Sequence, residues 1–343
     1  MLLGFLSPGL WELRQGIELL TGGRMKRITQ FANNCDAIVG WGHKPTAIKA
    51  RKIARKQGVP YIAFEDGFLR SVEPGNKEPP LSLIMDRTGI YYDARQPSDL
   101  EALIRRRAST DLSTHNIRNG IALLQGNHLS KYNNSNEKDV SILDLKSSGR
   151  SDRVLVVDQT IGDESIVGAL ADRDTFSKML EAAISENPGA EIIVRVHPET
   201  VLGRKAGHFC GAHIAKMAQK DIKVKKAVEA GLVRVTPEPI SAWALLGACE
   251  KIYCVSSQLG FEGLLAGCEV HCFGASFYNG WGLTCDRSEI VIERRKKVSL
   301  EAMFAAVYYD YCRYGHVEQQ AELSFPEAVQ VLLKKRDMFV ERH

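Results

Sequence analysis

The sequence has no apolar run of the roughly 20 residues that a membrane-spanning helix needs. Its apolar start, residues 2–6, is soon followed by Pro8, Glu12 and Arg14, and it lacks the charged leader and cleavage site of a secretory signal. It also has no Cys-x-x-Cys pair, and its eight scattered cysteines favour free thiols. We therefore expect a cytoplasmic protein without a membrane span.

An excess of one charge is also missing. The 45 basic and 41 acidic residues leave a net charge of +4 over 343 residues, which is too balanced to indicate a nucleic-acid partner. Basic residues do gather at 216–226 and 294–297, and such runs fit either solvated helix faces or an anionic membrane surface. Peripheral attachment to the inner membrane is therefore an open expectation.

The glycine pair Gly40-x-Gly42 follows an apolar run but lacks the third glycine of a dinucleotide-binding loop. Trp41 between the glycines would obstruct a pyrophosphate, and Pro45 lies where the loop would continue. The motif therefore favours a tight turn from strand to helix over a dinucleotide site. Lys44 in this turn is a candidate for facing a cleft.

Short apolar runs alternate with helical patterns along the chain. We expect strands at residues 1–6, 37–39, 59–64, 81–85, 90–92, 154–157, 192–194, 232–235, 251–255 and 270–273. We expect helices at residues 10–20, 46–57, 98–107, 166–185, 241–248, 299–314 and 325–335. This alternation predicts an α/β fold in which helices cover parallel sheets.

The chain length favours two domains, and the polar, aperiodic stretch 126–152 is typical of a surface linker. We expect an N-terminal Rossmann-like domain on the acceptor side over 1–150, a C-terminal Rossmann-like domain over 151–298, and closing helices over 299–343. Two Rossmann-like domains facing a central cleft form the GT-B layout of glycosyltransferases. At this point the likeness is an analogy of fold alone.

The clearest unit covers residues 153–199, where two apolar runs flank a helical pattern. In a parallel β-α-β unit, ligands bind beyond the carboxyl ends of the strands. The second run ends with Arg195, His197 and Pro198. Alternation places Arg195 and His197 on one side of the strand, so together they can hold a phosphate. A histidine packed in the core is the competing interpretation.

Two serines and two aspartates also lie at predicted strand or helix ends. Ser256 and Ser257 precede a helix whose positive end suits a phosphate, although taken alone they are better explained as an ordinary N-cap. Asp163 is either an N-cap or a nucleophilic carboxylate, and Asp158 is either a ligand contact or a structural hydrogen-bond acceptor.

The first half contributes Glu65-Asp66-Gly67 at the end of a predicted strand. Because adjacent carboxylates repel each other, one of them is expected to have the raised pKa that suits a general base. A solvated turn capped by Asp66 is an equally good alternative.

A late loop contains the aromatic residues Tyr278 and Trp281 among glycines. Aromatic rings of this kind offer a flat surface to a sugar ring. The alternative is a loop that packs its aromatic side chains inside.

In combination, Glu-Asp-Gly, His-Pro and a later Ser-Ser pair resemble the three motifs of bacterial sialyltransferases that use CMP-sugars. More specifically, the chain resembles the KpsC/LipA family of capsule polysaccharide proteins, which are retaining β-Kdo transferases. The resemblance covers nearly the whole chain and rests on residues 65–71 and 89–94 and on Gly40-Trp41-Gly42-x-Lys44-Pro45, Pro80-Leu81-Ser82-Leu83, Asp158-Gln159-Thr160-x-Gly162-Asp163-x-Ser165, Val196-His197-Pro198-Glu199, Ser257-Gln258-Leu259-Gly260-Phe261-Glu262 and Phe277-Tyr278-x-Gly280-Trp281-Gly282-Leu283-Thr284.

The resemblance implies transfer of Kdo from CMP-β-Kdo with retention of configuration. Retention by two displacements needs a carboxylate nucleophile and a base, for which we expect Asp163 and Glu65. The CMP phosphate is assigned to Arg195, His197, Pro198, Ser256 and Ser257. Candidates for binding the donor sugar or the acceptor are Lys44, Arg70, Asp158, Gln159, Tyr278 and Trp281.

A CMP-sugar carries one phosphate, so we expect no metal and no other cofactor. The expected partners are CMP-Kdo, a Kdo-terminated glycolipid or polysaccharide acceptor, and capsule biosynthesis or export proteins. Two alternatives stay open. One is a different CMP-sugar transferase, such as a sialyltransferase. The other is a catalytically silent nucleotide-binding subunit of a capsule assembly complex, against which the presence of both carboxylates argues.

Overall fold

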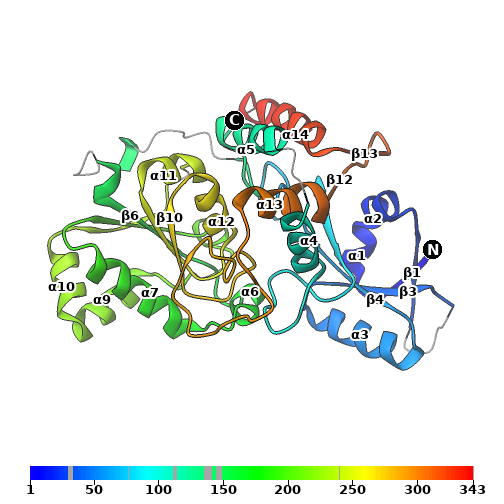
Figure 1. Ribbon diagram of the computed structural model, residues 1–343, viewed down its shortest axis with the longest axis horizontal. Coiled ribbons are helices and arrows are strands. Elements are labelled where there is room, and N and C mark those ends of the chain that lie inside the picture. The colour runs from blue at the N-terminus through cyan, green and yellow to red at the C-terminus, as the bar shows by residue number, and fades with distance from the viewer. Residues whose placement is uncertain are drawn as a thin grey trace.

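The computed structural model describes residues 1–29, 34–75, 77–110, 114–134, 141–143, 149–238 and 240–342 (Figure 1). Its two β-sheets lie side by side, each with helices packed against it. The predicted α/β fold, with two Rossmann-like halves, is confirmed. Among the described residues, no helix combines the length and the apolar character needed to cross a membrane.

The first sheet has the strand order β13-β12-β5-β4-β3-β1-β2. Strands β1 to β4 are parallel to one another, and β5, β12 and β13 add antiparallel pairings. The strands are β1 (Leu2–Phe5), β2 (Arg24–Arg27), β3 (Ala37–Trp41), β4 (Tyr61–Asp66), β5 (Ser82–Asp86), β12 (Cys312–His316) and β13 (Ala321–Leu323). The helices of this half are α1 (Pro8–Glu12), α2 (Arg14–Thr21), α3 (Pro45–Gln57), α4 (Asp99–Ala108) and α5 (Thr114–Gly126).

The second sheet is entirely parallel, with the order β11-β10-β9-β6-β7-β8. Its strands are β6 (Arg153–Val157), β7 (Glu191–Arg195), β8 (Val233–Thr236), β9 (Lys251–Cys254), β10 (Glu269–Cys272) and β11 (Cys285–Asp286). Its helices are α6 (Glu164–Gly168), α7 (Arg173–Glu186), α8 (Pro198–Val201), α9 (Gly211–Lys220), α10 (Ile222–Glu229), α11 (Ala242–Ala248) and α12 (Gln258–Leu265). Two short 3₁₀ turns, Ser141–Leu143 and Arg150–Asp152, precede it.

The order of the second sheet reverses between β6 and β9, because the chain first builds outward through β7 and β8 and then returns to the other side of β6. In open α/β sheets, ligands bind at such a switch point, beyond the carboxyl ends of the strands. The central residues of β6 and β7, 154–157 and 192–194, are apolar and buried because both faces of the sheet are covered. Val154 and Val156 pack toward α7, while Leu155 and Val157 pack toward the other half of the molecule.

Several expected elements differ from the structure. The expected helix 166–185 is split, because Leu170 has a φ of 58° and Asp172 starts α7 with a capping box. The helix expected at 10–20 is likewise split into α1 and α2. The strand expected at 90–92 is absent, because the Asp86 carboxylate accepts hydrogen bonds from the backbone of Thr88 and Gly89 and turns the chain. Helices α5, α9 and α10 were not predicted.

The closing segment is not only helical, as we had expected. Helix α13 (Leu300–Phe304) runs into a π-helix (Ala305–Tyr311), and the chain then enters β12 instead of continuing as a helix to residue 314. β12 pairs with β5 of the first sheet, with Cys312 opposite Ile84, before α14 (Phe325–Val340) closes the chain. The chain therefore returns to its first half, and the two halves are joined at more than the linker.

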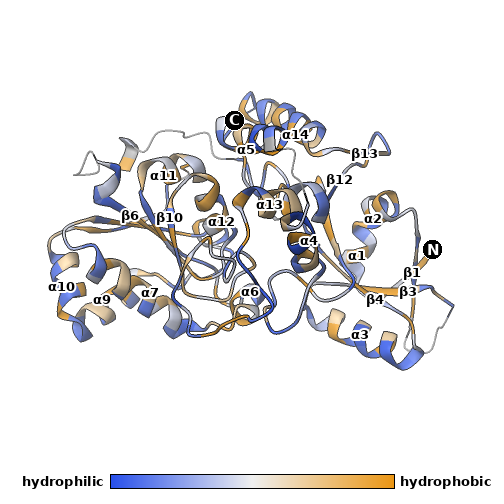
Figure 2. Cartoon of the chain, in the orientation of Figure 1, coloured by the Kyte–Doolittle hydropathy of each residue, from blue (hydrophilic) through white to orange (hydrophobic). Residues whose placement is uncertain are grey.

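One hydrophobic core belongs to both halves. It contains Phe68 and Leu69 after β4, Leu155 and Ile193 on the second sheet, and Tyr308 on the π-helix, all almost fully buried. Figure 2 shows hydrophobic residues along the strands and polar ones on the outward faces of α9 and α10. Because apolar burial dominates association between parts of a protein, this core fixes the two sheets relative to each other.

A buried charge cluster adds to this junction. Glu101 of α4 accepts hydrogen bonds from Arg294 Nε at 2.6 Å and from Arg295 Nε at 2.8 Å. Glu101 and Arg295 are both almost fully buried. The basic run 294–297 therefore contributes two arginines to a structural ion cluster rather than to a membrane-facing surface.

We predict that Glu101→Gln lowers the free energy of unfolding by about 3–5 kcal/mol, because it leaves the buried Arg295 charge without its partner. The measurement is chemical denaturation. The matched control is Glu301→Gln, which removes an exposed 3.8 Å pair with Arg118 and should cost less than about 1 kcal/mol. Equal, small effects of both substitutions would contradict the proposed role of the cluster.

Candidate active site between the two sheets

A cavity of about 570 Å³ opens between the two sheets. The carboxyl ends of β3 and β4 line it from one side and those of β6, β7 and β9 from the other. The structure thus brings together eleven of the thirteen predicted site residues: Lys44, Glu65, Arg70, Asp158, Gln159, Asp163, Arg195, His197, Pro198, Ser256 and Ser257. The remaining two, Tyr278 and Trp281, lie elsewhere.

Serine hydroxyls and an amide surround the switch point of the second sheet. Gln159 Nε2 donates to Ser256 Oγ at 3.0 Å and to Ser165 Oγ at 3.2 Å, and Ser256 N donates to Gln159 Oε1. Ser257 caps α12 by accepting a hydrogen bond from Leu259 N at 3.3 Å. The N-cap interpretation of Ser257 is therefore confirmed. Since the helix N-terminus also lines the cavity, the same end of α12 can receive an anion.

His197 and Arg195 lie beside this helix end, at the end of β7. The backbone N–H of Glu199 donates to His197 Nδ1 at 3.1 Å, so Nε2 carries the proton. Burial lowers the pKa of His197 to about 4, which makes the imidazole a neutral donor at pH 7. Burial also lowers the pKa of Arg195, which still stays positively charged. Arg195 is therefore the cation of this pair.

The two aspartates after β6 have different surroundings. Asp158 is almost fully buried and accepts hydrogen bonds from the backbone of Gln159 and His208 at 2.9 Å and of Phe209 at 3.4 Å. Its oxygens are thus used to hold the loop at 207–209, which fits a structural acceptor rather than a ligand contact. Asp163 lines the cavity and caps α6, and its carboxylate accepts a single hydrogen bond from the described residues, from Ser165 N at 2.9 Å.

Glu65 ends β4 on the opposite side of the cavity. Burial raises the pKa of Glu65 to about 7, and the neighbouring Asp66 adds to this, while Lys131 and Lys44 oppose it. The expected raised pKa is thus confirmed, but burial is a larger cause than repulsion from Asp66. Asp66 itself forms an ion pair with the buried Arg70 at 3.0 Å. Glu65 is therefore the carboxylate of the pair that is suited to accept a proton near neutral pH.

The glycine pair after β3 is explained by close packing. Gly42 has a φ of 48°, and a Cβ at this position would lie 2.6 Å from Glu65 Oε2. A Cβ at Gly40 would collide with Tyr61 and touch Ala47 of α3. The glycines thus let Glu65 and helix α3 approach the strand end, and no dinucleotide loop is present there.

Lys131 and Glu262 are charged residues of the cavity that sequence reasoning did not propose as site residues. Lys131 lies within the stretch that we had interpreted as a surface linker, yet its carbonyl accepts hydrogen bonds from Arg70 N and Ser71 N. Glu262 of α12 is almost fully buried, accepts hydrogen bonds from Ser130 Oγ and Gln258 Nε2, and has a pKa raised to about 7 by burial. Lys131 was missed because the stretch around it is polar and aperiodic, as a surface linker is. Glu262 was included only in a motif of the family resemblance and not as a site residue.

Tyr278 and Trp281 are fully buried and do not line the cavity. Tyr278 donates its hydroxyl to Ser257 O at 2.7 Å, and Trp281 Nε1 donates to Phe277 O at 3.0 Å. The prediction that these rings contact a sugar is therefore wrong, and the packed loop is the correct alternative. Through its hydrogen bond to the Ser257 carbonyl, Tyr278 helps to hold the N-cap residue of α12 in place.

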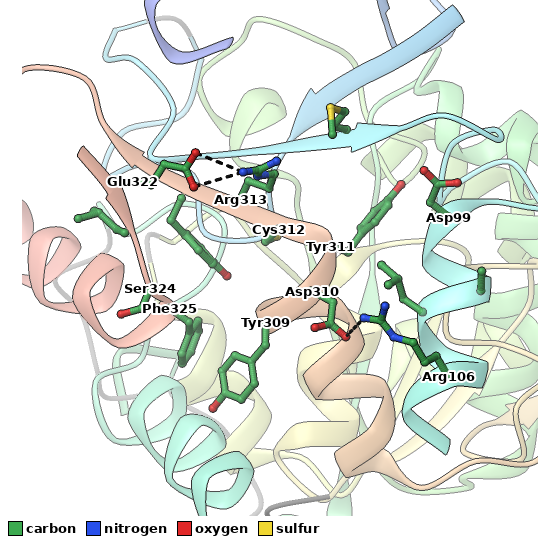
Figure 3. A pocket seen from close by; sticks show the side chains of 15 residues that line it. Asp99, Arg106, Tyr309, Asp310, Tyr311, Cys312, Arg313, Glu322, Ser324 and Phe325 are labelled. Atoms are coloured by element: carbon green, nitrogen blue, oxygen red, sulfur yellow. Dashed lines mark hydrogen bonds and ion pairs between the residues drawn. The ribbon is translucent and has the colours of Figure 1, made fainter. Parts of the chain in front are cut away.

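A second cavity of about 580 Å³ lies between α4, the π-helix and β12 (Figure 3). Two ion pairs lie among its charged side chains, Arg106 with Asp310 at 3.3 Å and Arg313 with Glu322 at 3.2 Å, and Asp99 accepts hydrogen bonds from Arg87 N and Thr88 Oγ1. It therefore lacks the free, converging polar groups of a binding site. Although the two cavities have nearly the same volume, the cavity between the sheets is the better candidate for a ligand-binding site.

Within the described residues, one group has the composition of a metal site: Glu269, His271 and Cys285, at the edge of the second sheet. His271 Nε2 lies 2.6 Å from Glu269 Oε1, and Arg287 Nε donates to His271 Nδ1 at 3.1 Å. Both ring nitrogens are thus engaged, so these residues form a hydrogen-bonded ion cluster. They do not line the cavity between the sheets.

We predict that Glu65→Gln stabilises the protein at alkaline pH. Because the folded state raises the pKa of Glu65 from 4.5 to about 7, keeping it ionised costs free energy that grows as the pH rises between these values. The gain in unfolding free energy should be near zero below pH 4.5, and should reach at most about 3 kcal/mol above pH 7.

Denaturant titration at several pH values measures this difference. Glu229→Gln, at an exposed site on α10, is the control and should show no such pH dependence. A difference between Glu65→Gln and wild type that does not change with pH would contradict the raised pKa.

The chain is similar in sequence to a known protein family and to several known proteins. Residues 36–314 match the family model described as "Capsule polysaccharide biosynthesis protein". The capsule polysaccharide modification protein LipA of Neisseria meningitidis serogroup A is 39% identical over 294 residues, which are 84% of this chain and 40% of LipA. The lipopolysaccharide-processing protein LpsZ of Rhizobium meliloti is 39% identical over 293 residues, or 84% of this chain and 62% of LpsZ. The chain thus spans about two fifths of LipA.

Solved structures of capsule polysaccharide enzymes are also similar to this chain. The β-Kdo 2,4 transferase of Thermosulfurimonas dismutans KpsC is 37% identical and superimposes with a TM-score of 0.84 over 97% of this chain and 98% of that one. The β-Kdo 2,7 transferase of the same KpsC is 22% identical with a TM-score of 0.65, which shows the shared fold alone. The protein is therefore a member of the capsule polysaccharide biosynthesis protein family.

Proposed function

We propose that the protein is a retaining glycosyltransferase that moves β-Kdo from CMP-Kdo onto a Kdo-containing glycolipid or polysaccharide acceptor of capsule biosynthesis. One observation carries this proposal: Asp163, which follows β6 of the second sheet, and Glu65, in β4 of the first sheet, line one cavity that also contains the N-terminus of α12, where an anion can bind. The likeness to a Kdo transferase at 37% identity over 97% of the chain supports the choice of sugar.

In this proposal the CMP phosphate binds at the N-terminus of α12. The Ser257 hydroxyl, which accepts one backbone hydrogen bond, keeps its own proton to donate. His197 Nε2–H is a second donor, and Arg195 supplies the positive charge that stabilises the departing CMP. One phosphate needs no bridging metal, so the reaction is proposed to proceed without a cofactor.

The chemistry then divides between the two carboxylates. The Asp163 carboxylate attacks the anomeric carbon of Kdo, and the bond from that carbon to the CMP phosphate oxygen breaks, which leaves a glycosyl ester and free CMP. An acceptor hydroxyl next attacks the same carbon as Glu65 takes its proton, and the ester bond to Asp163 breaks. Two inversions give net retention.

Asp163 is favoured over Asp158 as the nucleophile because Asp158 already accepts three backbone hydrogen bonds. Glu65 is favoured over Asp66 as the base because Asp66 is paired with Arg70. Both choices follow from which oxygens remain available to the substrate.

A lipid-linked acceptor would bring the protein to the cytoplasmic face of the inner membrane, next to capsule biosynthesis or export proteins. The lysines of α9 and α10 would then face anionic lipid, since Lys216, Lys220, Lys223, Lys225 and Lys226 are all exposed.

We predict that the protein transfers Kdo from CMP-Kdo to a synthetic Kdo-terminated acceptor and gives a β-linked product. The assay compares CMP-Kdo with CMP-sialic acid, and NMR of the product determines the anomeric configuration. Transfer from CMP-sialic acid alone would favour the sialyltransferase alternative. Binding of CMP without transfer from either donor would favour a silent nucleotide-binding subunit.

A further inference from the structure

Lys131 is a cavity residue whose ammonium forms no direct ion pair within the described part of the chain. It lines the cavity and is partly buried, yet no described carboxylate forms an ion pair with its Nζ, and no described group forms a hydrogen bond with it. The centroid of the Tyr132 ring lies 5.9 Å from the ammonium. The carboxyl groups of Asp66 and Glu65 act on the Lys131 charge from beyond ion-pair distance and help to raise its pKa, so the ammonium stays protonated and can also attract an anionic ligand.

The backbone holds this lysine firmly in place. Its carbonyl accepts hydrogen bonds from Arg70 N at 3.2 Å and Ser71 N at 3.3 Å. The Asn133 side chain bonds to Ser71 O at 2.9 Å and to Ser130 O at 2.8 Å, which closes the turn around residue 131. The Lys131 side chain therefore extends into the cavity from a loop that hydrogen bonds hold in place. This loop belongs to the polar stretch between the two halves.

The charge of Lys131 acts on groups from both sides of the cavity. It lowers the pKa of Glu65 and Tyr91 on the first side, and it lowers the pKa of His197 on the second side. Lys131 thus shares one cavity with the proposed base and the proposed phosphate site, and its charge acts on groups at both. A ligand that extends from Glu65 to the proposed phosphate site therefore lies in the cavity that Lys131 lines.

The other candidate cations are less suitable for a second anion. Arg70 is nearly buried and is already paired with Asp66 at 3.0 Å. Arg195 lies at the end of β7, beside His197, where the phosphate is proposed to bind. Lys44 lies in the turn after β3, with its ammonium 5.9 Å from the centre of the Trp41 ring. Lys205 is exposed at the cavity rim, so Lys131 is the cation that we assign to the second anion.

We propose that Lys131 binds the carboxylate that a 2-keto sugar acid carries on its anomeric carbon, and so selects such donors over CMP alone or neutral sugars. The inference rests on the proposed function. In a CMP-linked sugar acid, the carboxylate and the phosphate oxygen are attached to the same carbon, so the two anions need two separate, neighbouring cations. Arg195 and Lys131 provide them.

The pairing also connects donor binding with Glu65. Because the Lys131 charge lowers the pKa of Glu65, a donor carboxylate that neutralises this charge makes Glu65 a stronger base once the donor is in place. The charged and titratable groups around Lys131 are Glu65, Asp66, Tyr91 and Tyr132 on its own side and His197 opposite.

The test compares wild type, Lys131→Met, Lys131→Arg and the control Lys205→Met, which removes an exposed lysine at the cavity rim. Calorimetry with CMP and kinetics with CMP-Kdo are measured for each protein. Lys131→Met should bind CMP within twofold of wild type but lose about ten- to a hundredfold in kcat/KM for CMP-Kdo, as expected for one charged hydrogen bond. Lys131→Arg should recover most of this loss, and Lys205→Met should change it less than twofold.

Two further readouts separate binding of the carboxylate from a structural role. The C1 carboxamide analogue of CMP-Kdo, used as an inhibitor, should bind wild type and Lys131→Met with the same affinity, because it lacks the anion. The acidic limb of the pH–rate profile should move to higher pH in Lys131→Met, since the charge that lowers the pKa of Glu65 is gone.

Normal wild-type transfer with an unchanged kcat/KM in Lys131→Met would overturn this inference and leave the proposed function standing. An equal loss of affinity for CMP, CMP-Kdo and the carboxamide would also overturn it, by showing a general structural effect. Absence of Kdo transfer by wild type would overturn the proposed function, and this inference with it.

Discussion

The structure depends on the hydrophobic contact that joins its two sheets. Phe68, directly after the Glu-Asp-Gly turn, packs against Phe277 with ring centroids 5.1 Å apart, and Tyr91 packs against the same ring at 5.5 Å. Trp243 of α11 donates its indole N–H to the Leu129 carbonyl at 2.7 Å, and Gln258 of α12 reaches the Phe68 carbonyl at 2.9 Å. These contacts hold the carboxyl ends of β4 and of β6 toward one cavity, so that chemistry can be shared between two halves that are far apart in sequence.

The same burial sets the protonation states in the cavity. It raises the pKa of Glu65 and Glu262 to about 7 and lowers that of His197 to about 4. A carboxyl group near neutrality can exchange a proton, and a neutral imidazole with a fixed tautomer can donate one hydrogen bond in one direction. The cost of keeping these groups poorly hydrated is offset by the shared core and by buried clusters such as Glu101 with Arg294 and Arg295. Stability and function therefore depend on the same junction.

The sequence predicted the second half better than the first. Parallel strands buried on both faces are continuous apolar runs, and their carboxyl ends mark the ligand edge, which is why Asp163, His197 and Ser257 could be placed from pattern alone. Lys131 could not, because its role depends on docking of the linker onto Ser71, a contact far from it in sequence. Tyr278 and Trp281 were misplaced because an aromatic, glycine-rich loop has the same pattern whether it faces a sugar or the core. β12 was missed because Cys312 to His316 form a strand only where β5 offers a free edge.

In the proposed mechanism, the Asp163 carboxylate after β6 forms a covalent bond with the sugar, and the Glu65 carboxylate of β4 then activates the acceptor. The most direct measurement is intact-protein mass spectrometry of Glu65→Gln after incubation with CMP-Kdo. The account predicts a mass increase of one Kdo residue, with peptide mapping that places the ester on Asp163, and no adduct in the double variant Asp163→Ala with Glu65→Gln. An adduct on Asp158, or retaining transfer that survives Asp163→Ala, would contradict the account.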